Sequence, residues 1–385
     1  MGRLFHFYGD LRMKKSLLAL AALSTIAGVA QAQSSVTLYG TLDAGVAYQT
    51  NQDAAGSAGL NSANSGYRQS NRFGVKGTEV IGNGLNANFD LEMGLNTTTG
   101  QANGMSATDN QFFNRQSWIG LSTASTEVRL GRDYHQNFKT IALYDTMEYY
   151  YTGIAPTAAL LGSRLNNNLS IAQKFGNLTV GADYALNGGT ANNYTSLGGN
   201  SVSATQGNSY GASVRYDDGK LQVGAAYSVI SGDQYQYNTI VATALSSATG
   251  TAAAGATPTS SITNQQNAWT VGAAYTMGTV KLSAGYFNQK DQVAPTAQTV
   301  AWGGAKVALS PKVDVRAAYY QTNTTKSDST TGTTGLWIAA LDYKLSPRTT
   351  LYVEADQLNY SGANISSTSN QTTQSRFGIG MGHTF

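Results

Sequence analysis

The stretch LNANFDLEMGL (residues 85–95) alternates apolar side chains with polar or small ones along its whole length. The apolar set is Leu85, Ala87, Phe89, Leu91, Met93 and Leu95, and the other set is Asn86, Asn88, Asp90, Glu92 and Gly94. A period of two residues places the two sets on opposite faces of a β-strand. The stretch therefore predicts a strand with one apolar and one polar face.

The same alternation recurs along the chain. In 312–320, for example, Val313, Val315, Ala317 and Tyr319 oppose Lys312, Asp314, Arg316 and Ala318. Soluble sandwiches also alternate, so this pattern alone does not identify the solvent. The connections between the predicted strands do identify it. Short turns (175–178, 277–279, 345–348) alternate with long Ser/Thr/Asn/Gly-rich stretches (187–206, 231–266, 323–334). Short turns at one end and long loops at the other are typical of an outer-membrane β-barrel.

The predicted fold is thus all-β, a transmembrane antiparallel barrel. About 16 strands of about 9 to 13 residues are expected, an even number of strands long enough to cross a bilayer at a tilt. No sheet edge can remain open in lipid, so 36–48 is expected to pair with 374–385 and close the barrel. One pattern runs through residues 33–385 without a linker, which favours a single domain.

The first 32 residues have a different character. Residues 13–32 contain a basic head at Met13, Lys14 and Lys15, a short apolar stretch and the A-x-A sequence of residues 30–32. This pattern predicts a secretory signal peptide cleaved after Ala32. Residues 1–12 fit no part of it, so Met13 is predicted to be the true start and the upstream Met1 a misassigned one.

Composition excludes several other classes of protein. The chain has no cysteine, so no disulfide can stabilise it. Four of its 24 basic residues and one of its 21 acidic residues fall within 1–32, which leaves the remainder formally neutral. Charge therefore gives no argument for a nucleic-acid partner. The only histidines are His6, His135 and His383, with no ligand or triad spacing, so no metal, cofactor or catalytic residue is predicted and the protein is not expected to be an enzyme.

Residues 133–163 (DYHQNFKTIALYDTMEYYYTGIAPTAALLGS) interrupt the strands and show no two-residue alternation. Loops of this length are uncommon in compact domains and are usually functional or disordered. The many Tyr, Ile, Leu and Phe residues argue against disorder. The stretch is therefore expected to fold inward and narrow a water-filled barrel, with Asp145 and Glu148 near its middle.

With these features the chain resembles a general porin of Gram-negative outer membranes, of the β-proteobacterial type. The resemblance covers nearly all of 33–385 and is carried by SSVTLYGTLDAGVAY (34–48), SNRFGVKGTEVIGNGLNANFDLE (70–92), FNRQSWIGLST (113–123), EVRLGRDY (127–134) and RFGIGMGHTF (376–385). It implies a sixteen-stranded barrel in the cell outer membrane, usually a homotrimer, through which ions and small hydrophilic solutes diffuse. It also implies that the third loop folds into the lumen after Gly131 and Arg132.

Two further implications concern the end of the chain and the tip of the inward loop. The closing Phe385, preceded by alternate apolar residues, resembles the signal read by the barrel-assembly machinery, which is therefore an expected partner together with outer-membrane lipid. Similar porins often carry a Pro-Glu-Phe-Gly-like segment near the loop tip. This chain has Met147, Glu148, Tyr149 and Tyr150 there, which keeps the acid and an aromatic residue but changes the shape of the segment.

A diffusion pore sorts solutes by the width and the electric field of its constriction. Asp145 and Glu148 are expected to supply the acidic side. The predicted basic side is Arg72, Arg115 and Arg164, which match constriction arginines of similar porins, with Arg129 as an addition. By alternation, Arg72 opposes Phe73 and Val75, and Arg115 opposes Trp118. Alternatively, these arginines neutralise lumen acids or lie in the periplasmic mouth.

The predicted function is a general diffusion channel with a charged constriction. The alternative is a surface adhesin or receptor barrel that acts through its long Ser/Thr-rich loops. Neutralising the three arginines should move permeability toward cations, and removing the two acids should move it toward anions.

Overall fold

The computed structural model describes residues 35–62, 67–103, 105–106, 109–110, 112–148, 163–186, 193–195, 201–203, 208–231, 265–291, 296–326, 328–365 and 370–385. The predicted signal peptide, 1–32, and the loop residues 149–162 lie outside these ranges.

Sixteen antiparallel strands form the wall of a closed barrel. They are β1 (Ser35–Gln49), β3 (Arg72–Gly82), β4 (Leu85–Leu95), β8 (Gln116–Ser122), β9 (Thr126–Tyr134), β10 (Arg164–Phe175), β11 (Leu178–Ala185), β14 (Ser209–Asp217), β15 (Leu221–Ser231), β16 (Gln265–Met277), β17 (Val280–Asp291), β18 (Ala297–Ser310), β19 (Val313–Thr325), β20 (Thr331–Lys344), β21 (Thr349–Gly362) and β22 (Thr373–Thr384). Each strand pairs with its neighbours in this order. The predicted fold class and strand number are confirmed.

Shorter strands lie at the loop end of the barrel. They are β2 (Gly59–Ser62), which pairs with β1, β5 (Ala102–Asn103), which pairs with β4, and two small hairpins, β6 (Met105–Ser106) with β7 (Asp109–Asn110) and β12 (Asn193–Thr195) with β13 (Ser201–Ser203). At the other end the connections are tight: Gly278, at φ +58°, turns the chain from β16 into β17. Among the described residues, no helix is long and apolar enough to cross a membrane.

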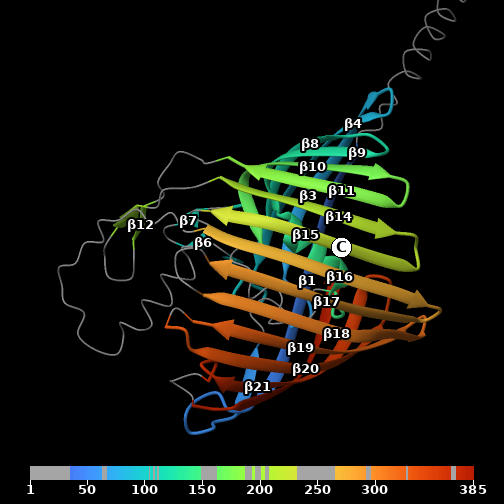
Figure 1. The fold of residues 1–385 in the computed structure, drawn as a ribbon. Helices are drawn as coiled ribbons and strands as arrows, with labels where there is room; N and C mark the ends of the chain where they lie inside the picture. Colours follow the sequence, from blue (N-terminus) through green and yellow to red (C-terminus); the bar gives the residue numbers. More distant parts are fainter. Residues whose placement is uncertain are drawn as a thin grey trace, which may run out of the picture.

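The barrel closes between the first and last strands, which lie side by side (Figure 1). In their register Thr41 pairs with Thr384 and Tyr48 with Phe377. Beyond it, Phe385 and Gly40 exchange two backbone hydrogen bonds of 3.1 Å. The expected pairing of 36–48 with 374–385 is confirmed, and it removes the open edge that lipid could not satisfy.

The two faces of the wall follow the sequence alternation. Ile119 and Leu341 are among the apolar side chains exposed on the outside. Asp90, Glu92 and Arg316 belong to the opposite set and are buried inside the barrel. The polar face therefore lines the lumen, as the period of two residues predicts.

The connection after β9 folds inward, as expected. It begins with helix α2 (Gln136–Tyr144), whose N-cap His135 accepts a hydrogen bond through Nδ1 from the backbone N–H of Phe138 at 3.4 Å. The helix contacts β14, β15, β16 and β17 from inside the barrel. Ile141, Tyr144 and Met147 have no exposed surface.

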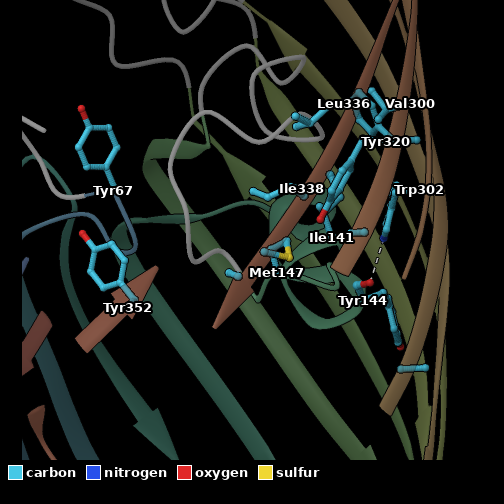
Figure 2. Close-up of a cluster of buried hydrophobic side chains, with 14 of the residues drawn as sticks. Tyr67, Ile141, Tyr144, Met147, Val300, Trp302, Tyr320, Leu336, Ile338 and Tyr352 are labelled. Atoms are coloured by element: carbon cyan, nitrogen blue, oxygen red, sulfur yellow. Dashed lines mark hydrogen bonds between the residues drawn. The ribbon is translucent and has the colours of Figure 1, made fainter. Parts of the chain in front are cut away.

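These three side chains complete a hydrophobic cluster with the inner wall. Figure 2 shows them alongside Val300, Trp302, Tyr320, Leu336 and Ile338. Burying a large apolar side chain contributes about 1.5–3 kcal/mol. The apolar residues that distinguished 133–163 in the sequence thus hold its first half against the wall.

Candidate functional site

The end of α2 is fixed to the wall by backbone and side-chain contacts. The indole Nε1 of Trp302 donates to the carbonyl oxygen of Tyr144 at 2.9 Å (Figure 2). The Asp145 N–H donates to the Ile141 carbonyl at 2.9 Å, and the Glu148 N–H donates to the Asp145 carbonyl at 3.0 Å. Glu148 has φ +56°, the left-handed region that costs a non-glycine residue about 1–2 kcal/mol. Surrounding contacts must therefore hold this turn.

A row of glycines in the wall makes room for the helix. Gly224, Gly272 and Gly285 are paired in register across β15, β16 and β17. A Cβ on Gly272 would lie 2.5 Å from the Tyr144 ring, and one on Gly224 would lie 2.5 Å from the Tyr144 hydroxyl. A side chain at Gly224 or Gly272 would therefore push Tyr144, and with it α2, toward the pore axis, whereas one at Gly285 would meet the Trp302 ring.

Asp145, the first of the predicted constriction acids, is buried with 4% of its surface exposed. The hydroxyl of Tyr320 on β19 donates a hydrogen bond to its carboxylate. Asp145 therefore lies at the contact between the loop and the wall, and its charge is withdrawn from the water-filled part of the lumen.

Glu148, the second predicted acid, meets a basic ladder on the wall. We use this name for Lys281, Lys306 and Arg316, which are paired in register across β17, β18 and β19. The Glu148 carboxylate lies 2.9 Å from Lys306 Nζ and 3.1 Å from Arg316 Nη1. Burial by itself would raise the pKa of Glu148, but the charges of Arg316 and Lys306 outweigh burial and lower that pKa below its ordinary value.

Arg316 continues into a chain of buried ion pairs. Its Nη2 lies 2.9 Å from Asp342 on β20, and Asp342 also lies 2.9 Å from Nε of Arg68. Arg68 belongs to the segment that leads into β3, and its neighbour Tyr67 donates its N–H to Asp43 at 3.1 Å. The chain Arg68–Asp342–Arg316–Glu148 therefore links two segments that fold onto the inner wall.

Arg72, Arg115 and Arg164 come together in a second group, the arginine cluster. Arg115 Nε lies 2.7 Å from Glu92 on β4, and Arg72 Nε lies 3.6 Å from the same carboxylate. Arg115 and Arg164 both donate to the hydroxyl of Tyr134 at the end of β9. The Arg164 guanidinium also lies over the Tyr134 ring, 4.3 Å from its centroid.

The cluster has more cations than acids. In the described part of the chain, Glu92 is shared by two arginines, and no carboxylate lies within 4.0 Å of Arg164. The alternative prediction, that these arginines only neutralise lumen acids, therefore accounts for part of their charge and leaves an excess.

Arg129, the additional arginine, lies on β9 among acids. Its Nη2 is 3.0 Å from Glu127 and its Nη1 is 3.2 Å from Asp133. Its guanidinium also covers the Trp118 ring, 4.2 Å from the centroid. Glu127 and Asp133 therefore largely compensate the charge of Arg129, whereas Arg164 has no such acidic neighbour within 4.0 Å in the described residues.

Trp118 pairs with Asp90 and so faces the lumen, which makes the predicted opposition of Arg115 and Trp118 wrong: Arg115 precedes β8, and its direction is not set by the alternation of that strand.

The structure does not join the predicted acids to the predicted arginines. Within the described residues, no ion pair of up to 4.0 Å connects Asp145 or Glu148 with Arg72, Arg115 or Arg164. The cations that meet Glu148 are Lys306 and Arg316, which the sequence reasoning did not select. Alternation placed Arg316 on the polar face of 312–320, but no pattern in the neighbouring sequence indicated its position along the barrel axis.

No group of three or more metal-ligating side chains occurs among the described residues. The polar groups gathered here can bind and repel ions and orient polar solutes, which is the chemistry of a charged narrowing.

Comparison with known proteins agrees with the closed barrel and its charged lumen. A family model described as "Gram-negative porin" matches residues 19–363. The chain is similar to outer membrane porin protein 32 of Delftia acidovorans, 40% identical over 186 residues that cover 45% of this chain and 50% of that protein. It is also similar to an outer membrane porin protein of Bordetella pertussis, 41% identical over 124 residues, which are 29% of this chain and 31% of that protein. The matches therefore span half or less of these curated relatives.

Solved structures show the same fold. An anion-selective porin from Comamonas acidovorans superposes with a TM-score of 0.67 at 24% identity, covering 91% of this chain and 100% of that chain. A Salmonella typhi OmpF complex with daunomycin has a TM-score of 0.64 at 17% identity, covering 91% of this chain and 97% of that chain.

Proposed function

Because the chain belongs to the Gram-negative porin family, we propose that it forms a water-filled channel through which ions and small hydrophilic solutes diffuse passively. The protein belongs to the outer membrane, as its relatives do. The family and the relatives are named as porins, which favours a channel over the adhesin or receptor barrel and over an enzyme.

The connection after β9 folds inside a closed barrel, and charged groups are gathered where it meets the wall: the arginine cluster on one set of strands, and Glu148 with the basic ladder on another. A barrel that only presented outer loops would not need charged side chains organised inside its lumen. Opposed charges at a narrowing create a field in which polar solutes can align.

The residues of the constriction that we propose differ from those expected from the sequence. Glu148, which keeps part of its side chain exposed while it contacts Lys306 and Arg316, supplies the acidic side. Arg72, Arg115 and Arg164 supply an excess of positive charge, and Arg129 adds little because two acids compensate it. Asp145 contributes by positioning the turn that carries Glu148.

This balance of charges favours anions. A mild anion preference is supported by the excess of cations in the arginine cluster, and the similar porin from Comamonas acidovorans is described as anion-selective. The proposed solutes are therefore small hydrophilic molecules and ions, with anions passing more readily than cations.

The proposed partners follow from the outer surface and the end of the chain. Exposed apolar side chains on the outside of the wall fit contact with lipid and with a second and third copy in a homotrimer. Phe377, Ile379, Met381 and Phe385 are exposed on one face of the last strand, which fits recognition by the barrel-assembly machinery.

The channel is tested with the refolded mature protein in planar bilayers and in liposomes. We expect stepwise, ohmic conductance and liposome swelling in neutral sugars that declines as the sugar grows larger. A correctly folded protein that shows neither would contradict the proposal. A trimer that migrates intact on unheated gels and dissociates on heating would support the assembly.

A further inference from the structure

A cavity of about 210 Å³ lies between α2 and the wall strands β9, β10, β11 and β14. The charged side chains that line it are Arg129, Lys139 and Arg215 and one carboxylate, Glu127. Each molecule of liquid water occupies about 30 Å³. The cavity is therefore large enough for several waters or for a small polyatomic ion, and we call it the basic alcove.

The unsatisfied polar groups in the alcove are able to donate hydrogen bonds. The Tyr144 hydroxyl and Arg129 Nε are buried and have no hydrogen-bond partner in the part of the chain that the structure describes. An arginine Nε–H can only donate, and a tyrosine hydroxyl can donate one hydrogen bond. A ligand with several acceptor oxygens could therefore bind both groups.

Arg215 is the cation of the alcove with the fewest partners. Within the described residues no carboxylate lies within 4.0 Å of it, and none of the hydrogen bonds found there involves its side chain. It lies on β14, in register with Gly224, whose missing Cβ leaves room for the Tyr144 hydroxyl. The guanidinium of Arg215 and the hydroxyl of Tyr144 thus belong to the same part of the alcove.

The nearby acids are already engaged. Glu127 accepts two hydrogen bonds of 3.0 Å from Arg129, and Asp133 lies 3.2 Å from Arg129 and 2.9 Å from Lys139. These contacts compensate Arg129 and Lys139 within the protein.

Two further acids lie nearby, Asp217 on β14 two residues beyond Arg215 and Asp183 on β11. Asp217 accepts from the Gln222 side chain at 2.9 Å and from the Gly219 N–H at 2.9 Å. Asp183 accepts from the Gln136 N–H at 3.0 Å. The charges of Arg215 and Asp217 interact electrostatically, but within the described residues no carboxylate oxygen comes within 4.0 Å of Arg215, so its guanidinium has not formed a close ion pair.

We propose that the basic alcove binds a small multivalent oxyanion, of which inorganic phosphate is the simplest example. Arg215 supplies the principal charge, and the Tyr144 hydroxyl and Arg129 Nε supply further donors. Guanidinium groups match the geometry of phosphate oxygens, and charge-assisted hydrogen bonds are the strong ones. The site is distinct from the proposed constriction, because it lies behind α2, and a bound oxyanion would tie the helix to β14.

A crystallographic experiment locates the anion. Crystals of the refolded protein are soaked in selenate, whose anomalous scattering identifies it. We expect a peak in the alcove beside Arg215 in the wild type, no peak there in R215Q, and an unchanged peak in K220Q. Lys220 lies exposed in the turn that follows β14, so K220Q loses the same charge from the same hairpin. An empty alcove in the wild type, or a peak that R215Q leaves unchanged, would overturn the proposal.

A solution experiment excludes binding that occurs only at crystal concentrations. Calorimetric titration with inorganic phosphate at constant ionic strength should show a site that R215Q weakens by roughly tenfold or more, the usual consequence of losing a charged hydrogen bond. Y144F should weaken it less, and K220Q should match the wild type. R164Q, altered in the arginine cluster, should keep the alcove site. Equal phosphate affinity of folded wild type and R215Q, or selenate in crystals without phosphate binding in solution, would refute it.

Discussion

Glu148 and Asp145 lie three residues apart, yet their surroundings give them different roles. Glu148 keeps 28% of its side-chain surface exposed and meets two cations, Lys306 and Arg316. Asp145 is buried and accepts a hydrogen bond from Tyr320. A charge exposed to the lumen acts on passing ions, whereas a buried hydrogen-bonded one acts on the position of the chain.

The two acids should therefore respond differently to neutralisation. E148Q removes a negative charge from the lumen and leaves Lys306 and Arg316 with only their wall partners Asp314 and Asp342, so its reversal potential in a salt gradient should shift toward anions. D145N should shift the reversal potential less. Because it weakens a buried contact, it should instead lower stability by about 1–3 kcal/mol. Equal shifts of the reversal potential in both variants would contradict this division.

The pH dependence of Glu148 follows from its lowered pKa. A carboxylate whose pKa is lower in the folded state keeps its charge, and its contribution to stability, down to that lower value. More than half of the difference in reversal potential between wild type and E148Q should therefore remain when pH falls from 7 to the ordinary carboxyl value of 4.5, and the rest should be lost below it. With an unshifted pKa, half of the difference would already be lost at 4.5.

At the scale of elements, α2 depends on the glycine row in the wall. G272A would place a Cβ 2.5 Å from the Tyr144 ring. Overpacking of this kind costs about 1–3 kcal/mol, and it should displace the inward loop. We expect a lower melting temperature in detergent and noisier single-channel conductance.

Gly303 provides a matched control for that prediction. It lies on β18 next to Trp302, but a Cβ there would have its nearest neighbour at 3.9 Å. G303A should therefore resemble the wild type in both measurements. The importance of the glycine row would be disproved by a G272A variant with the same stability and the same quiet conductance as G303A.

The strands were predictable because their signal is local. Side-chain parity within one strand, as in 85–95 and 312–320, already separates the two faces of the wall, and the alternation of short turns with long loops indicates that one of them meets lipid. The apolar residues Ile141, Tyr144 and Met147 likewise marked the inward loop in the sequence. Ion pairs such as Arg68 with Asp342 join residues 274 positions apart, and their formation depends on the register of many strands. No local pattern could have selected Lys306 and Arg316 as the partners of Glu148.

At the scale of the whole molecule, the proposed selectivity is electrostatic and should be screened by salt. The Debye length falls from about 10 Å at 0.1 M to about 3 Å at 1 M. The anion preference of the wild type should therefore be largest in dilute salt and shrink as ionic strength rises, in reversal potentials measured at a constant concentration ratio. A preference that did not change with ionic strength would indicate sorting by size or by a tightly bound site.

The barrel, the inward loop and the charged lumen together fit a passive channel, and we propose that its ion preference arises largely from Arg72, Arg115 and Arg164. The most direct measurement is the reversal potential of the refolded wild type and of the R72Q/R115Q/R164Q variant, recorded in the same planar bilayers under a KCl gradient. Both proteins should conduct, and the variant should be shifted toward cations relative to the wild type. A wild type without conductance, or a folded, conducting variant with the reversal potential of the wild type, would contradict the account.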